Sequence, residues 1–169
     1  MSAVGFRIRT GGAADLAGVV MMERGIAEAP HWTKAEYEAI VNAEGSDGSI
    51  DSGARRCLMI AEAEERRLLG FAVGKVVGSG LEWVGEIESV AVDGAARRRG
   101  MGRSLCEAVI AWCRRQGARA VELEVRAGSV GAIALYGRLG FVSVGKRKGY
   151  YWEPVEDALL MKLELWTQS

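Results

Sequence analysis

The sequence predicts an α/β protein in which a central mixed, mostly antiparallel sheet of about seven strands is flanked by about four helices. Two patterns carry this prediction. Between residues 56 and 92, apolar or alternating segments follow one another as in an antiparallel meander. Beyond residue 100, helix and strand patterns alternate, which favours local parallel pairing through crossover connections. The chain has 169 residues, 49% of them hydrophobic and 26% charged, so we expect one packed domain over residues 1–169.

The first elements are a strand and two helices. Residues 4–9 alternate apolar and polar side chains, as expected of a half-buried strand, and residues 13–28 repeat apolar positions at helical spacing. Thr33–Glu36 (TKAE) has the form of a capping box and predicts a helix that ends at about Val41. Residues 43–54 are rich in Gly, Ser and Asp without periodicity and predict a flexible loop.

The meander consists of RCLMIAEA, RLLGFAVGKVVG and EWVGEIESVAV. A helix is predicted to begin near Gly102 and to end at Gly117, a residue suited to a helix C-terminus. Its apolar face carries Leu105, Val109 and Trp112. The remaining predicted elements are a strand at 120–125, a helix at 129–140, and strands at 141–147 and 158–165.

Composition argues against several classes of protein. Lys plus Arg and Asp plus Glu number 22 each, whereas dedicated nucleic-acid-binding domains are usually basic, so we expect no nucleic-acid partner. Cys57, Cys106 and Cys113 lack metal-ligand spacing, and Cys106 and Cys113 share one helix face as ordinary core residues do. We see no signal-peptide pattern and no apolar run of roughly 18 residues. The expectation is a reduced, metal-free cytoplasmic protein without a membrane segment.

A cluster of positively charged residues lies between a predicted strand and a predicted helix, in the segment GAARRRGMG at residues 94–102. A helix N-terminus presents unpaired N–H groups and a partial positive charge, and glycines let a phosphate approach the backbone. The segment lacks the Gly-Lys-Ser/Thr ending of a Walker A loop, and Leu105 stands where a dinucleotide fingerprint needs its third glycine. The residues alone leave three alternatives open: a phosphate ligand, nucleic acid, or a solvated turn.

Arg97–Gly102 fits the pattern Q/R-x-x-G-x-G/A, and three longer stretches follow one another at family spacing: IESVAVDGAARRRGMG, LEVRAGSVGAIALYGRLGF and KGYYWEPVEDALLMKLEL. In these stretches the chain resembles the GNAT superfamily of N-acetyltransferases, in particular its branch that acetylates protein N-termini. The resemblance covers about residues 83–165. Before that, only PHW (30–32), ahead of the capped helix, resembles the family.

The resemblance implies a GNAT fold that is splayed at the cofactor site, with acetyl-CoA as the acetyl donor. The arginine–glycine loop would bind the pyrophosphate through backbone amides, and the preceding strand would pair with the pantetheine arm and polarise the thioester carbonyl. The implied cofactor-binding residues are Val90, Ala91, Val92, Arg97, Arg98, Arg99, Gly100, Met101, Gly102, Arg103, Ser104 and Ser129. Ser129 stands where this branch has an asparagine, so its contact with the cofactor would be shorter or water-mediated.

The resemblance also implies Glu124 as general base and Tyr136 as general acid. Glu88 is a rival base, because other members of the superfamily place a catalytic glutamate on that strand. From the residues alone, Glu122 and Glu124 could equally be the solvated face of a strand, and Tyr136 could be a core residue.

The implied substrate-binding residues are Trp32, Tyr150 and Tyr151. Glu156 and Asp157 resemble the segment that hydrogen-bonds the first peptide units of the substrate, and His31 is an alternative groove residue or an exposed loop residue.

The predicted function is direct transfer of acetyl from acetyl-CoA to the N-terminal amine, with alanine as the expected residue, of a small-subunit ribosomal protein. The charge mixture favours a monomer. The alternatives are acetylation of a small amine, a polyamine or a protein lysine, and a non-catalytic CoA-binding regulator.

Overall fold

The computed structural model describes residues 5–25, 32–45, 54–79, 82–97, 99–152 and 154–165. Seven strands and four α-helices follow one another in this part of the chain. In order they are β1 (Phe6–Thr10), α1 (Leu16–Arg24), α2 (Lys34–Gly45), β2 (Ala54–Ala63), β3 (Leu68–Ser79), β4 (Glu82–Val92), α3 (Met101–Arg115), β5 (Ala118–Arg126), α4 (Val130–Arg138), β6 (Val142–Tyr151) and β7 (Glu156–Glu164).

All seven strands form one mixed sheet in the order β1-β2-β3-β4-β5-β7-β6. Neighbouring strands are antiparallel except β4 and β5, which are parallel and joined through α3. The predicted fold class and the predicted parallel pairing at this crossover are therefore confirmed. The next crossover differs from a simple alternation, because β7, the last strand in the chain, inserts between β5 and β6.

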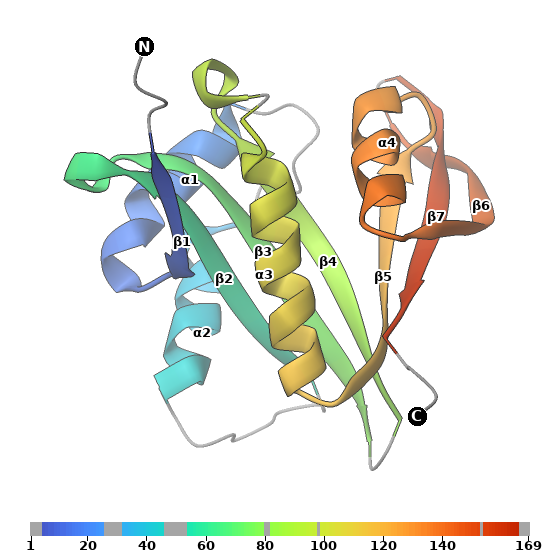
Figure 1. Ribbon diagram of the computed structural model, residues 1–169, viewed down its shortest axis with the longest axis horizontal. Coiled ribbons are helices and arrows are strands. Elements are labelled where there is room, and N and C mark those ends of the chain that lie inside the picture. The colour runs from blue at the N-terminus through green and yellow to red at the C-terminus, as the bar shows by residue number, and fades with distance from the viewer. Residues whose placement is uncertain are drawn as a thin grey trace.

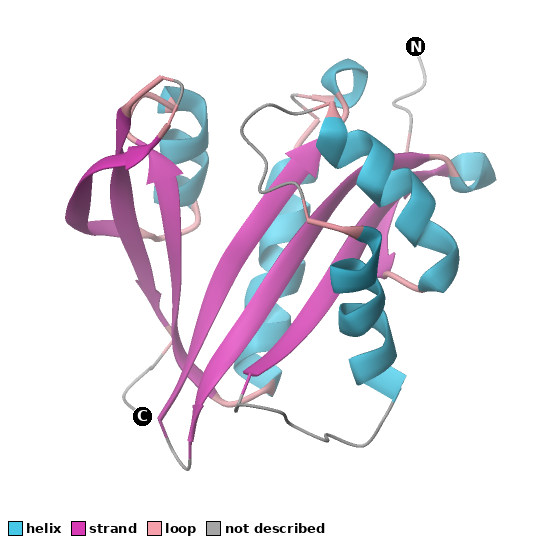
Figure 2. Cartoon of the chain, turned by 180° about the vertical axis from the view of Figure 1, so that it is seen from behind, coloured by secondary structure: helices cyan, strands magenta, loops and turns pink. Residues whose placement is uncertain are grey.

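Helices cover both faces of the sheet (Figure 1). α3 and α4 lie on one face, and α1 and α2 lie on the other, as the view from behind shows (Figure 2). Each layer buries its own apolar cluster: Leu105 and Val109 of α3 belong to the first, and Val19 of α1 and Tyr37 of α2 to the second. Burial of this apolar surface on both faces provides the main stabilisation of the sheet.

The predicted ends of helices and strands agree best with the structure where residues close together in the sequence determine them. The capping box is confirmed, since the N–H of Thr33 donates to Glu36 Oε2 at 2.6 Å and the N–H of Glu36 donates to Thr33 Oγ1 at 3.2 Å. The helix that follows is longer than the sequence predicts, since it continues past Val41 to Gly45, and Tyr37 and Ile40 pack it onto the sheet. The predicted loop 43–54 therefore begins inside α2 and ends inside β2, and residues 46–53 lie outside the described part.

All three cysteines are buried, as expected of core thiols. Cys106 and Cys113 lie on the face of α3 that packs on the sheet, and burial raises the pKa of each thiol to about 12. α3 approaches the sheet closely at Gly85, where a Cβ atom would lie 2.7 Å from Cys113 Sγ. The thiols are therefore packing residues that stay protonated at neutral pH.

A cluster of charged residues fixes the β1 edge of the sheet. Glu62 is 1% exposed, and its carboxylate pairs with Arg7 and, at 2.9 Å, with Arg9, which also pairs with Asp15 at 2.6 Å. Burial alone would raise the pKa of Glu62, but hydrogen bonds from the two arginines outweigh it and hold the pKa below its ordinary range. The hydrogen bond from Arg9 likewise lowers the pKa of Asp15.

This cluster predicts a loss of stability in acid. A carboxylate with a lowered pKa contributes to the free energy of unfolding above its unfolded pKa of about 4, and the contribution disappears as the pH falls through the folded pKa. We expect Tm to fall between pH 5 and pH 3, and Glu62→Gln to lower Tm at pH 7 while flattening this fall. Thermal melts at four pH values check it; parallel curves for the two proteins would contradict the assignment.

Candidate active site

The sheet opens between β4 and β5. Their ladder runs from Trp83 and Ala118 to Glu86 and Glu122 and then stops, although both strands continue. Beyond this rung β4 stays paired with β3, and β5 stays paired with β7, so the two halves of the sheet diverge (Figure 1). The edge of β4 from residue 87 to residue 92 is thereby left without a strand partner. Its backbone N–H and C=O groups can pair with an extended ligand.

β4 contains a bulge just past the last rung. Val73 of β3 pairs with Ser89 and Gly74 pairs with Ile87, so Glu88 is an extra residue in β4. Bulges bend a strand and occur often beside active sites. Glu88 lies on the α1 and α2 face of the sheet, where it contacts Arg56 and Lys75.

The turn between β4 and α3 follows the free edge. Asp93 caps a short 3-10 turn (Gly94–Ala96), and Arg97 Nε donates to the carbonyl of Val92 at 3.4 Å. Gly100 then adopts the left-handed conformation, with φ of 75°, and α3 begins at Met101. The first N–H groups of a helix have no partner within it, so this turn provides a site for an anion next to the open strands.

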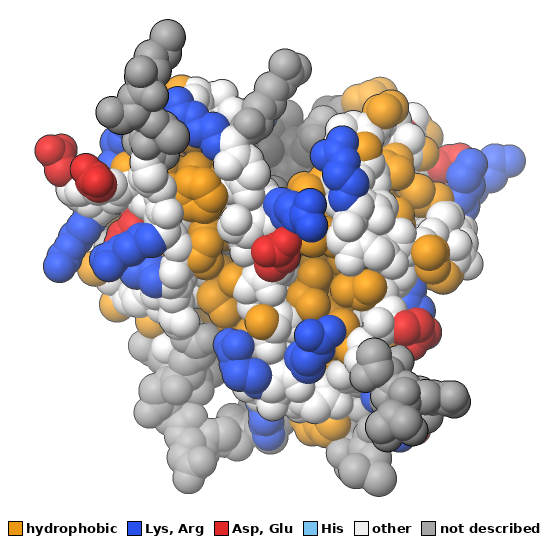
Figure 3. Space-filling model, viewed as in Figure 1, with side chains coloured by type: hydrophobic (Ala, Val, Ile, Leu, Met, Phe, Trp, Pro, Cys, Tyr) orange, Lys and Arg blue, Asp and Glu red, His pale blue; other side chains and the backbone are white. Residues whose placement is uncertain are grey.

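The arginines of this turn differ in their contacts and exposure. Arg103 pairs with Glu107 at 2.9 Å, while Arg97 and Arg99 are exposed, and Arg98 lies outside the described residues. On the face that carries α3, basic side chains are scattered singly among apolar and uncharged ones rather than gathered in one stripe (Figure 3).

The two glycines of the turn predict different tolerance to substitution. Gly100 has a positive φ, which costs an L-residue roughly 1–2 kcal/mol. A Cβ atom on Gly102 would lie 3.5 Å from the nearest side-chain atom of Leu135, an ordinary contact. We expect Gly100→Ala to lower the free energy of unfolding by about 1 kcal/mol and to weaken anion binding at this turn, and Gly102→Ala to do neither. Thermal melts and pyrophosphate titrations of both variants check this; equal effects would contradict it.

Glu124 lies on β5 just past the last β4–β5 rung, on the α1 and α2 face. Its side chain is 24% exposed, and Arg147 Nε lies 3.1 Å from Oε1. Tyr150 also hydrogen-bonds Glu124, and the charge of Glu124 is the main cause that raises the pKa of the Tyr150 hydroxyl. Glu124 is thus a carboxylate at the mouth of the opening, reachable from solvent and fixed by two partners from β6.

Aromatic and basic side chains surround this carboxylate. The rings of Tyr150 and Tyr151 pack edge to face with centroids 5.1 Å apart, and the guanidinium of Arg126 lies 4.3 Å from the Tyr151 ring centre. The predicted substrate-binding tyrosines are therefore brought next to Glu124. The pKa of the Tyr151 hydroxyl is raised mainly by burial, and the negative charge of Glu124 adds to the rise.

Two acidic residues of β7 brace the same region. Asp157 Oδ1 accepts the N–H of Gly149 at 2.8 Å, and Glu156 Oε1 accepts the N–H of Gly128 at 3.2 Å. In the described structure these carboxylates bind the protein's own backbone. They hold the β6 segment and the turn before α4 in place.

Tyr136 lies on α4, on the opposite face of the sheet from Glu124. Its ring packs against Phe141 with centroids 5.9 Å apart and contacts the apolar cluster of α3. Burial raises the pKa of its hydroxyl, and the nearby Cys106 thiol adds to the rise. The hydroxyl therefore stays protonated and able to donate at neutral and moderately alkaline pH.

Ser129 immediately precedes α4, but its hydroxyl makes no capping hydrogen bond. Serine is a common N-cap residue, but here its side chain does not cap the helix. The carbonyl of Ser129 accepts the N–H of Ile133 at 3.0 Å, and the helix starts without a side-chain cap. The hydroxyl is left for another partner.

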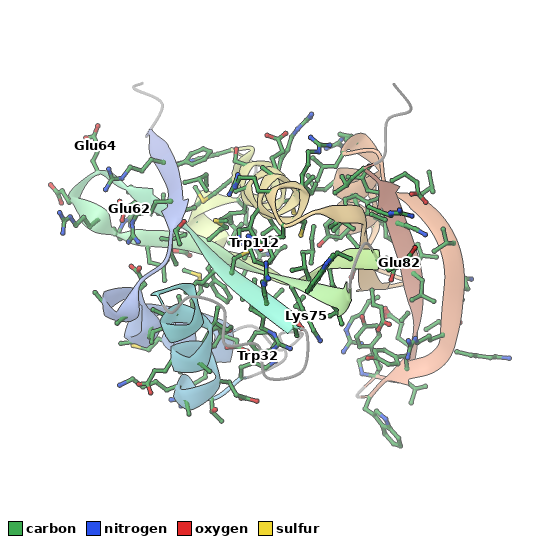
Figure 4. All side chains as sticks on the ribbon, turned by 90° about the horizontal axis from the view of Figure 1, so that it is seen from below. Trp32, Glu62, Glu64, Lys75, Glu82 and Trp112 are labelled. Atoms are coloured by element: carbon green, nitrogen blue, oxygen red, sulfur yellow. The ribbon has the colours of Figure 1, made fainter. Side chains whose placement is uncertain are left out.

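Glu88, the rival base, lies in a different environment from Glu124. Its side chain is 11% exposed and pairs with Arg56 at 3.0 Å and with Lys75 at 3.9 Å. Trp32 lies on the same face, and its ring centre is 6.0 Å from the Arg56 guanidinium (Figure 4). His31 lies outside the described residues. Trp32 and Glu88 thus line one pocket, and Tyr150 and Glu124 form a second group.

Sequence reasoning missed several residues of this face. Glu86 is half-buried on the last β4–β5 rung. Burial is the main cause that raises the pKa of its carboxyl group, and the negative charge of Glu88 adds to the rise. Arg56 and Lys75 face each other on the consecutive strands β2 and β3, whereas Arg147 lies on β6. Alternation places each of them on a face, but the sheet order decides which glutamate each one contacts.

The described residues contain no group of three or more His, Cys, Asp or Glu arranged to hold a metal ion. None of the described helices is both long enough and apolar enough to span a bilayer.

Comparison with known proteins shows to which family this arrangement of strands and helices belongs. The family model for the acetyltransferase (GNAT) family matches residues 24–141, which include the open strands, the arginine–glycine turn and α4. The chain belongs to the GNAT family. GNAT enzymes transfer an acetyl group from acetyl-CoA to an amine, and the chain is accordingly an acetyl-CoA-dependent N-acetyltransferase.

Relatives of known activity include enzymes that act on protein N-termini. The [ribosomal protein bS18]-alanine N-acetyltransferase of Escherichia coli K12 is 34% identical over 112 residues, which cover 65% of this chain and 73% of the relative. The catalytic subunit NAA20 of the N-terminal acetyltransferase B complex of Arabidopsis thaliana is 32% identical over 107 residues, 63% of this chain and 61% of the relative.

Solved GNAT structures share the fold. The ribosomal-protein-S18-alanine N-acetyltransferase of Escherichia coli superposes with a TM-score of 0.76 at 25% identity, over 98% of this chain and 97% of the other. NAA60 of Arabidopsis thaliana in complex with acetyl-CoA superposes with a TM-score of 0.79 at 20% identity, over 95% and 99% of the two chains.

Proposed function

We propose that this GNAT enzyme is a protein Nα-acetyltransferase that acts on an N-terminal alanine of a small-subunit ribosomal protein. The observation that carries the proposal is the placement of Glu124 and Tyr136 on opposite faces of the open sheet. Tyr151 interacts electrostatically with both. A donor thioester can then enter from the α3 and α4 face while the acceptor amine enters from the α1 and α2 face.

The described residues fit acetyl-CoA. Its pyrophosphate would bind at the turn from Arg97 to Ser104, and its pantetheine arm along the free edge of β4 at Val90, Ala91 and Val92. When bound, the thioester supplies the electrophilic carbonyl carbon. An N–H group of β4 would stabilise the negative charge that develops on the carbonyl oxygen. The Ser129 hydroxyl, free of a capping role, would contact the cofactor beside α4.

The acceptor amine must be neutral to attack. An α-amino group has a pKa of about 7.7–8.0 against about 10.4 for lysine, a difference worth about 3.4 kcal/mol. Glu124 would take the proton directly or through water, and Tyr136 would donate a hydrogen bond or a proton to the departing thiolate. Tyr150, Tyr151 and Trp32 would hold the peptide. No described residue is assigned as a covalent acetyl carrier, so transfer is direct.

The proposal includes the setting of the enzyme. The chain acts as one domain over residues 1–169, as a monomer in the cytoplasm, with a ribosomal protein rather than nucleic acid or membrane as its partner. Similarity to the ribosomal-protein-alanine N-acetyltransferase supports the ribosomal target.

CoA release from acetyl-CoA with two short peptides tests the proposal. One peptide has a free N-terminal alanine, and the other is blocked at its N-terminus and contains an internal lysine. We expect turnover with the first peptide only. Turnover with the blocked peptide, or with a polyamine instead of either peptide, would overturn the Nα assignment. Tight CoA binding without turnover on any amine would indicate a regulator.

A further inference from the structure

Two glutamates are almost completely buried, and their partners differ. Glu23 and Glu62 are each 1% exposed. Glu62 pairs with arginines, but no described Lys or Arg forms an ion pair with Glu23. Its partners are neutral: the N–H of Trp32 donates to Oε1 at 2.7 Å, and the hydroxyl of Tyr37 donates to Oε2 at 2.5 Å. A buried carboxylate without a cation is costly to the fold, and an apolar side chain would cover this position at lower cost.

Glu23 joins two elements at one point. It lies in the last turn of α1, while Trp32 and Tyr37 lie just before and inside α2. The rings of Trp32 and Tyr37 are 5.6 Å apart, and Tyr37 packs edge-on against Phe71 of β3 at 6.2 Å. The carboxylate therefore fixes where the Trp32 ring stands relative to the sheet.

The Trp32 ring is one wall of a pocket of about 440 Å³, whose other lining residues include Ile40, Ala54, Arg56 and Glu88. Trp32, Ala39, Ile40 and Ala54 form the apolar part of the lining, and Glu36, Arg56 and Glu88 form the charged part. Glu36 caps its own helix by accepting the N–H of Thr33 at 2.6 Å. At the base, Arg56 makes two hydrogen bonds to Glu88, at 3.0 Å and 3.4 Å, so these charges already satisfy each other. The pocket suits an uncharged side chain with an apolar body better than a charged one.

The pocket lies on the acceptor side of the open sheet. Glu88 is its β4 member, and Glu86, next to the bulge, interacts electrostatically with both Glu88 and Glu124. Glu88 and Glu124 lie on the same face of the sheet, on either side of the opening between β4 and β5. A peptide that crosses the opening with its amine at Glu124 would extend toward this pocket.

We propose that the pocket receives the side chain of the acceptor's second residue and that Glu23 is the positioning residue that holds its Trp32 wall. The inference rests on the proposed Nα-acetyltransferase function. Glu23 touches neither donor nor acceptor; it acts through the backbone of Trp32 and the hydroxyl of Tyr37.

The test compares two peptides, Ala-Leu and Ala-Gly at their N-termini, in the wild type and three variants. Glu23→Leu keeps the volume and removes both acceptor atoms. Glu23→Gln keeps an acceptor for Trp32 and a partner for Tyr37. Glu62→Leu is the matched control, because Glu62 is equally buried but lies at the β1 edge, away from Trp32 (Figure 4).

We expect the wild type to prefer the Ala-Leu peptide at least tenfold in kcat/KM, mainly through KM. Glu23→Leu should reduce this preference below threefold and leave the Kd of acetyl-CoA within twofold, while Glu23→Gln and Glu62→Leu should keep the preference. If Glu23→Leu does not fold, Tyr37→Phe removes one of the two hydrogen bonds and should reduce the preference in part.

Three results would overturn the inference: no preference in the wild type, an intact preference in Glu23→Leu or in its substitute Tyr37→Phe, or a rise in the acetyl-CoA Kd that matches the rise in acceptor KM. If the wild type acetylates no N-terminal peptide at all, the proposed function fails, and the inference fails with it. A wild type that acetylates both peptides equally contradicts the inference alone.

Discussion

Glu124→Gln is expected to lower kcat/KM for an N-terminal alanine peptide by about 10²–10⁴-fold, the usual contribution of a general base. The amide keeps the size and the hydrogen bond from Tyr150 but cannot take the amine proton. The ion pair with Arg147 is lost as well, yet Arg147 is 55% exposed, so we expect little change in stability. Initial rates over a range of peptide concentrations, with thermal melts alongside, measure both effects.

Two further glutamates make this result interpretable. Glu122→Gln is the matched control, because Glu122 lies two residues earlier on β5, on the same face, and is exposed. We expect it to keep kcat/KM within threefold. Glu88→Gln tests the rival base, which we expect to affect peptide KM more than kcat because Glu88 is tied to Arg56. A large fall in kcat in Glu88→Gln with normal activity in Glu124→Gln would reverse the assignment.

The fold was predictable where the deciding interactions are local. Thr33 and Glu36 are three residues apart and cap each other, so the start of α2 could be predicted from four letters. The end of α2 was not predictable, because the helix continues from Val41 to Gly45 into a segment rich in Gly, Ser and Asp that has no apolar periodicity. The insertion of β7 between β5 and β6 is likewise a long-range pairing that no local pattern encodes.

The residues of the candidate site likewise divide into those that nearby motifs predict and those that depend on long-range strand pairing. Glu124 and Tyr136 were proposed from a resemblance carried by nearby motifs. In the structure Glu124 lies just past the last β4–β5 rung, and Tyr136 packs on Phe141 and interacts electrostatically with Cys106 of α3 and Tyr151 of β6. The contacts that tune them, such as Arg147 on Glu124, depend on register across three strands. The bulge at Glu88 separately shifts the register between β3 and β4 by one residue, which no alternation pattern reveals.

Tyr136→Phe is expected to lower kcat by about 10²-fold or more while leaving the Kd of acetyl-CoA within about twofold, because a proton donor to the leaving group acts mainly in the transition state. The substitution keeps the ring and its packing on Phe141, so we expect Tm to stay close to that of the wild type. Single-turnover rates and CoA titrations measure the two quantities separately. Equal losses in kcat and in cofactor affinity would instead assign the hydroxyl to cofactor binding.

The pH dependence provides an independent check of the same residue. Burial raises the pKa of Tyr136 above its ordinary value of about 10, so its neutral, donating form persists as the pH rises. Because only the neutral form can donate, a donor role predicts no loss of kcat between pH 7 and pH 9 from this group. The amine loses its proton over the same range, so the wild-type rate should rise and then level. A falling limb below pH 9 that disappears in Tyr136→Phe would mean that the hydroxyl ionises early, and a different group would then have to protonate the thiolate.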